Sequence, residues 1–268
     1  MFRFDKDERY LLCRVKIIGV GDFGSKLVNY SIANMIFDAG FTVIATKNET
    51  LLNSSAPQRI KLSDTTDEDS RKNLSELIEG LDLLFIFTDL TDENISRQIA
   101  ELSKDILTVA IVPESAPNKE KFQNLVDSLI SVEDNNIFLM YSAVRCITGL
   151  VTESQMVALD FADVNELLKN SGKSYVAYGK GTEEHSVIDA MKSAVNSVKD
   201  ALSKSKRVLF GIFGYHENLS MIEVHEASNL MQYAAHPDSE IIWSATDNLI
   251  VADDFAEVII IATNDDEK

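Results

Sequence analysis

The sequence has little cysteine, little proline and no long apolar run. Its 268 residues include 2 cysteines, 4 prolines and 11 glycines, which argues against a disulfide scaffold, long linkers or disorder. Cys13 and Cys146 lack the spacing of metal ligands, and both are expected to be buried as small hydrophobes. No apolar run approaches the roughly 20 residues of a membrane span. With a charged N-terminus unlike a secretory signal, the chain is expected to be cytoplasmic, without direct membrane binding.

Basic residues are also scarce. The chain carries 25 Lys and Arg against 43 Asp and Glu, a net charge of −18, which repels phosphate backbones and disfavours nucleic acid as a partner. Its 4 histidines show no zinc spacing, and no GxSxG nucleophile turn occurs. The sequence therefore predicts no metal site and no serine hydrolase.

What the chain has instead is a regular alternation of strands and helices. Apolar, β-branched runs predict strands, helical spacing predicts the segments between them, and the alternation is typical of an α/β fold with a doubly wound parallel sheet. Later segments predict a mixed sheet with helices. Expected strands cover 15–20, 41–46, 81–88, 107–112, 136–141, 174–180, 207–215, 240–244 and 257–263, and expected helices 25–38, 70–79, 94–103, 119–131, 142–154, 163–169, 184–203 and 221–235.

A glycine turn follows the first strand. Gly19, Gly21 and Gly24 match GxGxxG, a pattern that lets backbone N–H groups and a helix N-terminus approach phosphate. With Lys47 after the second strand to meet a 2′-phosphate, the pattern also allows an NADP-linked oxidoreductase. Alternatively, the glycines serve only a tight turn and close packing of helix on strand.

Two carboxylates stand three residues apart at the start of a predicted helix. Asp160 and Asp163 are close enough to share one face, where they can orient a water molecule. An Asp cap with a second acid in the first turn also stabilises any helix, and from chemistry alone this capping role is favoured.

Residues 144–164 (VRCITGLVTESQMVALDFADV) resemble the end of the central helix and the following loop of FtsZ, in the tubulin superfamily. Residues 16–29, 126–130, 219–237 and 257–263 are similar to further FtsZ segments, so the resemblance covers about 14 to 263. It implies a Rossmann-like nucleotide-binding domain with a parallel sheet and the central helix over 13–155. A smaller α+β domain with a mixed sheet is implied over 156–264.

The resemblance also implies a site and partners. Members of the family bind GTP and stack head to tail, so that the acidic loop of one subunit completes the GTPase site of the next. Asp160 and Asp163 would be the catalytic acids, although Ala158 replaces the asparagine before them. The partners would be FtsZ-like subunits or further copies of this chain, and the nucleotide contacts would come from Gly19, Gly21, Asp22, Gly24, Ser25, Lys26 and Lys47.

The phosphate-binding half departs from the family pattern. Where the tubulin signature GGGTGTG is expected, this chain has 88–94, TDLTDEN, which brings Asp89, Asp92 and Glu93 to the place of a triphosphate. Asp22, Phe23 and Ser25 replace glycines, Lys26 replaces an asparagine, residues 47–49 replace an asparagine-threonine-aspartate, and 113–117 form a shortened ribose loop. Phe138 aligns with the aspartate that reaches guanine.

These departures predict a pseudo-GTPase that has lost GTP, with no cofactor expected. The chain also ends directly after its final predicted strand, where FtsZ continues into a linker and a peptide that recruits membrane tethers. We therefore expect a cytoskeletal or cell-division-related protein that caps, modulates or co-assembles with FtsZ-type filaments. The alternative is a self-polymerising GTPase that binds GTP and Mg²⁺ in an atypical pocket.

Overall fold

The computed structural model describes residues 13–36, 39–62, 68–152, 159–182, 185–214, 219–247 and 255–264. The first half contains, in chain order, β1 (Val15–Val20), α1 (Gly21–Ala33), β2 (Ala39–Ala45), α2 (Asn48–Leu52), β3 (Gln58–Lys61), α3 (Glu68–Ile78), β4 (Leu83–Phe87), α4 (Glu93–Leu102), β5 (Leu107–Pro113), α5 (Lys119–Gln123), β6 (Ser128–Val132) and α6 (Ile137–Thr152).

The second half continues with α7 (Phe161–Leu168), β7 (Gly172–Thr182), α8 (Ser186–Ser197), α9 (Lys199–Leu202), β8 (Arg207–Gly214), α10 (Met221–Ala234), β9 (Glu240–Asp247) and β10 (Phe255–Asn264). Over the described residues, all strands join one sheet of 10 strands in the order β3-β2-β1-β4-β5-β6-β7-β10-β8-β9. The mixed α/β architecture is the one that the sequence predicts.

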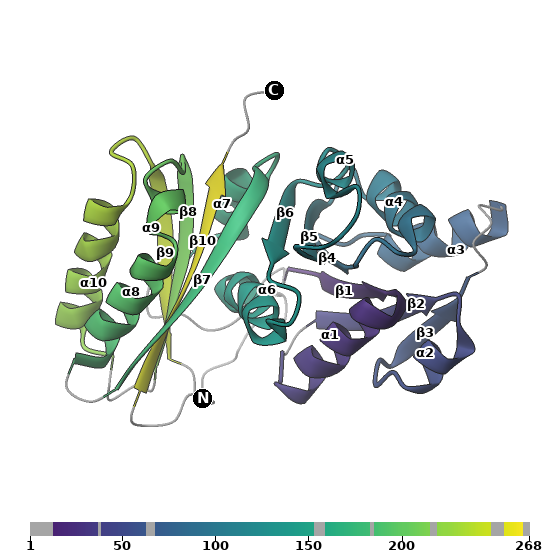
Figure 1. The fold of residues 1–268 in the computed structure, drawn as a ribbon, viewed down its shortest axis with the longest axis horizontal. Coiled ribbons are helices and arrows are strands. Elements are labelled where there is room, and N and C mark those ends of the chain that lie inside the picture. The colour runs from purple at the N-terminus through teal and green to yellow at the C-terminus, as the bar shows by residue number, and fades with distance from the viewer. Residues whose placement is uncertain are drawn as a thin grey trace, which may run out of the picture.

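In the first half the strands are parallel and carry helices on both faces (Figure 1, purple to teal). Apart from the exposed edge strand β3, the strands are rich in apolar residues, as expected where both faces are buried: every residue of β4 and β5 is buried. One core joins the sheet to α1 and α6, and a second joins it to α3, α4 and α5. The carboxyl ends of β1, β2, β4, β5 and β6 therefore meet at one edge of this half.

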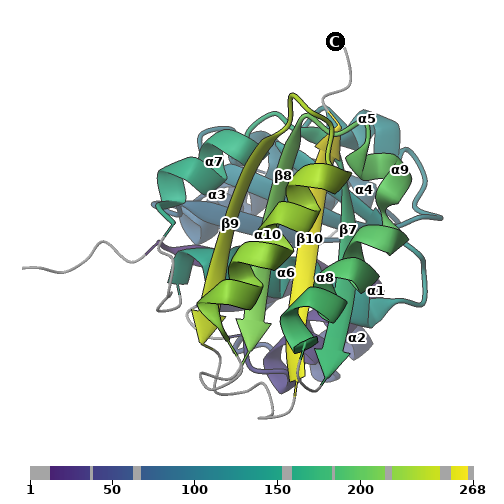
Figure 2. The ribbon, with the colours of Figure 1, turned by 90° about the vertical axis from the view of Figure 1, so that its left-hand side faces the viewer.

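In the second half, β10 runs antiparallel to both β7 and β8. Helices α8 and α10 cover the outer face of this half of the sheet, and Figure 2 shows both helices in front of the strands. The inner face packs on α6 and α7. Close approach of α8 to β7 depends on Gly179 and Gly181, because a Cβ at either would lie 1.9 Å from a helix carbonyl oxygen.

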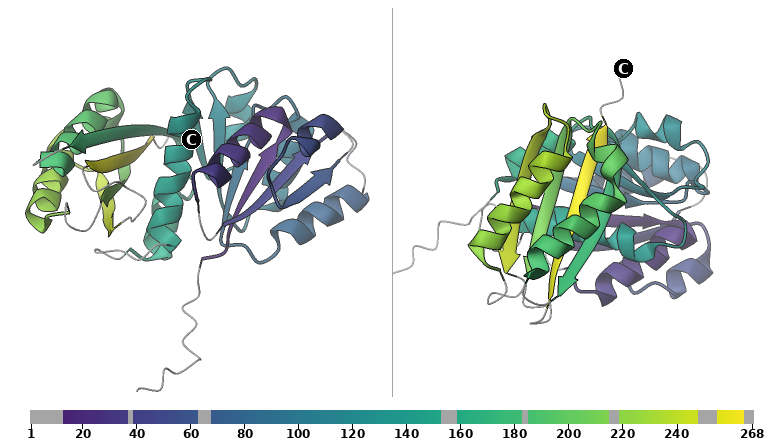
Figure 3. Two further views of the ribbon diagram at one scale, coloured as in Figure 1. Left: turned by 90° about the horizontal axis from the view of Figure 1, so that it is seen from below. Right: turned by 60° about the vertical axis from the view of Figure 1, so that its left-hand side comes forward.

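The central helix α6 stands between the two halves (Figure 3, left). Beside it, β6 and β7 pair in parallel over Ser128–Ile130 and 172–174, which makes the two sheets continuous. Arg145 of α6 forms an ion pair with Glu257 of β10, with Nη1 and Oε2 2.5 Å apart and the side chains 13% and 9% exposed. Tyr178 of β7 donates to the other carboxylate oxygen at 2.6 Å, and burial, followed by this hydrogen bond, raises the pKa of Tyr178.

Two predicted elements were wrong. The helix expected over 119–131 is only the short α5, and its last residues form strand β6, which is buried between β5 and β7. The strand expected over 136–141 is the first turn of α6, which begins at Ile137. Both errors concern short apolar runs, where periodicity alone does not separate a buried strand from a buried helix.

Both cysteines remain thiols: Cys146 is buried and Cys13 is half-buried. Burial raises the pKa of each thiol to about 12, so both are unreactive near neutral pH. Among the described helices, none has the length and apolarity needed to cross a bilayer.

The buried ion pair gives a first prediction. Glu257→Gln leaves the Arg145 guanidinium buried without its counter-charge, which we expect to lower the free energy of unfolding by about 3–5 kcal/mol. Urea unfolding followed by circular dichroism measures the change. Asp189→Asn is the matched control, because Asp189 pairs with Lys192 on an exposed face of α8 and should change stability by less than about 1 kcal/mol. Equal effects of the two substitutions on the free energy of unfolding would contradict the conclusion that the ion pair of Arg145 and Glu257 is buried and stabilising.

Candidate nucleotide edge and acidic helix

The glycines after β1 have two different roles. A Cβ at Gly19 would lie 2.5 Å from the carbonyl oxygen of Gly24, and a Cβ at Gly24 would lie 2.5 Å from that of Phe87. These two glycines therefore allow α1 to pack directly on β1 and β4, which is the packing alternative. Gly21 differs, because it begins α1 with φ +68°, a conformation that side-chain-bearing residues rarely adopt.

The N-terminus of α1 faces a carboxylate of the chain itself. A Cβ at Gly21 would lie 2.9 Å from Oδ2 of Asp92, which belongs to the loop after β4. A helix N-terminus attracts negative charge, and in nucleotide-binding folds a phosphate satisfies it. Here Asp92 brings a negative charge to the same place.

The loop after β4 is closed by its own hydrogen bonds. The carboxylate of Asp89 accepts from the backbone N–H of Thr91 at 3.1 Å and from its hydroxyl at 2.7 Å. Between them, Leu90 is buried with φ 60° and donates its N–H to the hydroxyl of Thr88 at 2.9 Å. The polar groups of this turn therefore hydrogen-bond with one another. Its left-handed position is occupied by a leucine and not by a glycine.

The third acid of this loop is also engaged. Glu93 pairs with Arg97 at 3.2 Å and accepts a hydrogen bond from Asn118 at 3.0 Å. The shortened loop over 113–117 is held in a similar way, because the N–H of Ser115 donates to Asp134 at 2.9 Å. The loops at the carboxyl edge therefore bind one another.

Asp22 lies on the flank of α1 and is held from two sides. The hydroxyl of Thr50 donates to this carboxylate and lowers its pKa, and Lys47 adds to the effect through a contact of 3.2 Å. The charge of Lys47, the residue expected to meet a 2′-phosphate, is therefore balanced by Asp22. A hollow of about 340 Å³ opens beside them, lined by Asp22, Ser25, Lys26, Asn29, Lys47, Glu49, Thr50 and Asn53.

Phe138, aligned with the guanine-binding aspartate, lies at the start of α6 with 37% of its surface exposed. Its ring packs edge-on against Tyr178, with the centroids 4.7 Å apart. A phenyl ring has no group to accept hydrogen bonds from a base. At this position the chain makes an apolar contact with Tyr178 of the second half.

Asp160 and Asp163 form a reciprocal capping box at the start of α7. The N–H of Ala162 donates to Asp160 at 3.3 Å, and the N–H of Asp160 donates to Asp163 at 3.4 Å. Both side chains remain exposed. The capping role is thus seen directly, while the outer faces of both carboxylates stay accessible. Ala158, just before them, lies outside the described residues.

The two groups of predicted residues lie at opposite edges of the sheet. Asp22, Ser25, Lys26 and Lys47 line one hollow at the carboxyl edge. The acidic pair follows α6, which starts at the carboxyl edge and has 16 residues, a length of about 24 Å.

Thr50 was not predicted as a site residue, because its helix α2 was not predicted. The polar residues that follow the second strand were the signal that could have indicated it. Among the described residues, no three His, Cys, Asp or Glu side chains converge as metal ligands.

No known protein-family profile matches this sequence. Several solved structures do resemble its fold. A tryptophan-to-tyrosine mutant of FtsZ from M. jannaschii matches 94% of this chain and 91% of its own, at 20% identity and a TM-score of 0.84. CetZ from Methanosaeta thermophila matches 96% and 88%, at 16% identity and 0.73. GDP-bound CetZ1 from Haloferax volcanii matches 93% of both chains, at 14% identity and 0.69.

These similarities confirm the fold that the sequence resemblance implied: the chain has the two-domain fold of FtsZ and CetZ.

Proposed function

We propose that this chain is a cytoskeletal pseudo-GTPase that docks the exposed end of α7 on the nucleotide face of an FtsZ-type subunit. It would cap, modulate or co-assemble with filaments of that subunit. The observation that carries the proposal is an asymmetry. The loop over 88–94, where the family's phosphate-binding loop is expected, is held by its own hydrogen bonds, whereas Asp160 and Asp163 stay exposed.

The charge at the carboxyl edge argues against a bound triphosphate. A carboxylate and a phosphate oxygen about 4 Å apart repel by about 4 kcal/mol at an effective dielectric constant of about 20. Two such repulsions, from Asp89 and Asp92, would offset the binding free energy of roughly 8 kcal/mol that corresponds to a micromolar dissociation constant. Lys47 and Arg97 are already paired with Asp22 and Glu93.

The exposed acids support a role toward another subunit. An empty FtsZ dimer from M. jannaschii matches 94% of this chain at 20% identity and a TM-score of 0.80, so self-association occurs on this fold. If the same arrangement serves this chain, the α7 end would face a neighbour's nucleotide. Asp160 and Asp163 would then orient water at a GTP that the neighbour holds.

Calorimetric titration with GTP and Mg²⁺ tests the loss of nucleotide. For the nucleotide-stripped protein we expect no binding tighter than about 1 mM, because the edge brings negative charge to the phosphates. FtsZ from M. jannaschii under the same conditions is the positive control. A micromolar dissociation constant would instead establish the alternative, a self-polymerising GTPase with an atypical pocket.

Substitutions at Asp160 test the role in docking. Serine is a good helix N-cap, so Asp160→Ser removes the carboxylate and keeps the cap, whereas Asp160→Ala removes both. The assay measures phosphate release by M. jannaschii FtsZ, held below its own assembly concentration, as this protein is added. We expect wild-type protein to raise turnover and both variants to lower that gain about tenfold or more.

If Asp160→Ser retains the full effect while Asp160→Ala loses it, the carboxylate serves only as a cap and the catalytic part of the proposal is wrong. If wild-type protein leaves turnover unchanged at saturating concentration, the docking itself is rejected.

A further inference from the structure

Helix α7 is held at its C-terminal end by side chains from two other parts of the fold, Arg207 and Asp127. The last carbonyl groups of a helix have no intrahelical partner, and here Arg207 of β8 serves them. Its Nη1 donates to the carbonyl oxygens of Leu167 at 2.9 Å, Lys169 at 3.2 Å and Glu166 at 3.4 Å. A positive charge near the C-terminus of a helix also interacts favourably with the helix dipole.

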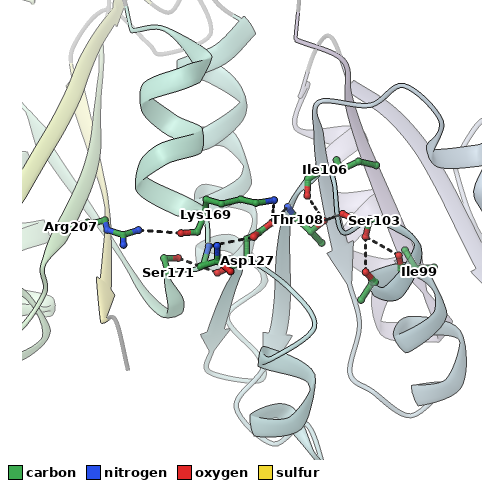
Figure 4. Close-up of polar contacts among 10 residues, drawn as sticks. Ile99, Ser103, Ile106, Thr108, Asp127, Lys169, Ser171 and Arg207 are labelled. Carbon is green, nitrogen blue, oxygen red and sulfur yellow. Dashed lines mark hydrogen bonds and ion pairs between the residues drawn. The ribbon is translucent and has the colours of Figure 1, made fainter. Parts of the chain in front are cut away.

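The residue after α7 is tied to the first half. Lys169 contacts Oδ2 of Asp127 at 3.2 Å (Figure 4). Asp127 is only 8% exposed, precedes β6, and accepts the backbone N–H of Thr108 at 2.9 Å and of Asn170 at 3.4 Å. A buried carboxylate with this many donors is held in one geometry, and removing its counter-charge is costly.

These contacts form a clamp, defined here as Asp127, Lys169 and Arg207. Asp127 directly precedes β6 and its partner Thr108 lies in β5, both in the first half, whereas Arg207 is the first residue of β8 in the second half. In Figure 4 the three side chains form a line across the junction of the two halves. The short helix that presents Asp160 is thus fixed to both halves at the end away from that residue.

We propose that Asp127 and Arg207 are positioning residues that set the direction of α7 and so the place of Asp160 and Asp163. The inference rests on the proposed docking function. Helix α7 has 8 residues, a length of about 12 Å, so a tilt of about 15° at the clamp moves its N-terminus by about 3 Å. Displacements of about 1 Å at reacting groups can lower rates about a hundredfold.

Asp127→Asn tests the clamp, because it keeps an oxygen for the N–H of Thr108 and removes the charge that faces Lys169. Arg207→Gln is the second variant, at the partly exposed end of the clamp. Asp189→Asn, which breaks an exposed pair on α8, is the matched control. Two measurements are made: hydrogen exchange of α7 amides in the isolated protein, and GTP turnover by M. jannaschii FtsZ.

For both clamp variants we expect α7 amides to exchange about tenfold faster than in the wild type, with α10 unchanged. The maximal gain in partner turnover should fall about tenfold, while the half-saturating concentration changes by less than about threefold. A variant that only weakened the fold would speed exchange in both helices.

Unchanged exchange in α7 overturns the proposal, because α7 is then held without the clamp. Faster exchange with unchanged turnover overturns it too, provided that Asp160→Ser still lowers turnover, and in that case the docking function stands. If Asp160→Ser also leaves turnover unchanged, the catalytic role proposed for Asp160 fails and the positioning role fails with it.

Discussion

The central helix α6 lies between the two halves of the sheet, and the arrangement of the molecule depends on its burial. Most of its residues are inaccessible to water, and its one buried charge, Arg145, meets Glu257 of the opposite half. Because α6 joins the carboxyl edge to the acidic helix, its position fixes the separation of the two candidate surfaces. The pairing of β6 with β7 adds a second, backbone connection across the same junction.

Within this frame, the loop after β4 is held by contacts of its own chain. In such folds a bound phosphate satisfies backbone donors at a helix N-terminus. In this chain Asp92 approaches that N-terminus, Asp89 accepts from its own turn, and Thr88 accepts from Leu90. These polar groups of the loop therefore have partners within the chain.

Much of the fold was readable from the sequence because the strands are strongly patterned. The apolar runs of β1, β4 and β5, separated by helical spacing, predicted the parallel sheet. The region around β6 and the start of α6 was predicted wrongly because both are short apolar segments, for which periodicity does not separate strand from helix. At the candidate site, the sequence predicted that Asp160 and Asp163 cap a helix, which the structure confirms, and their catalytic role stays a prediction. The partners that hold Asp22 and α7 are distant in the chain and carry no motif. Thr50, Asp127 and Arg207 became visible only when the fold brought them together.

The two ends of α7 illustrate how structural and functional roles combine in one element. The capping box at its start accounts for Asp160 and Asp163 as stabilising groups, and a cap alone needs no particular orientation relative to the rest of the molecule. The clamp at its other end does constrain orientation, through a buried carboxylate and an arginine from opposite halves. A buried charged contact adds little net stability compared with apolar packing. Its presence at the end of a short helix whose N-terminal acids are exposed is therefore better explained by the need to hold the direction of that helix than by stability alone.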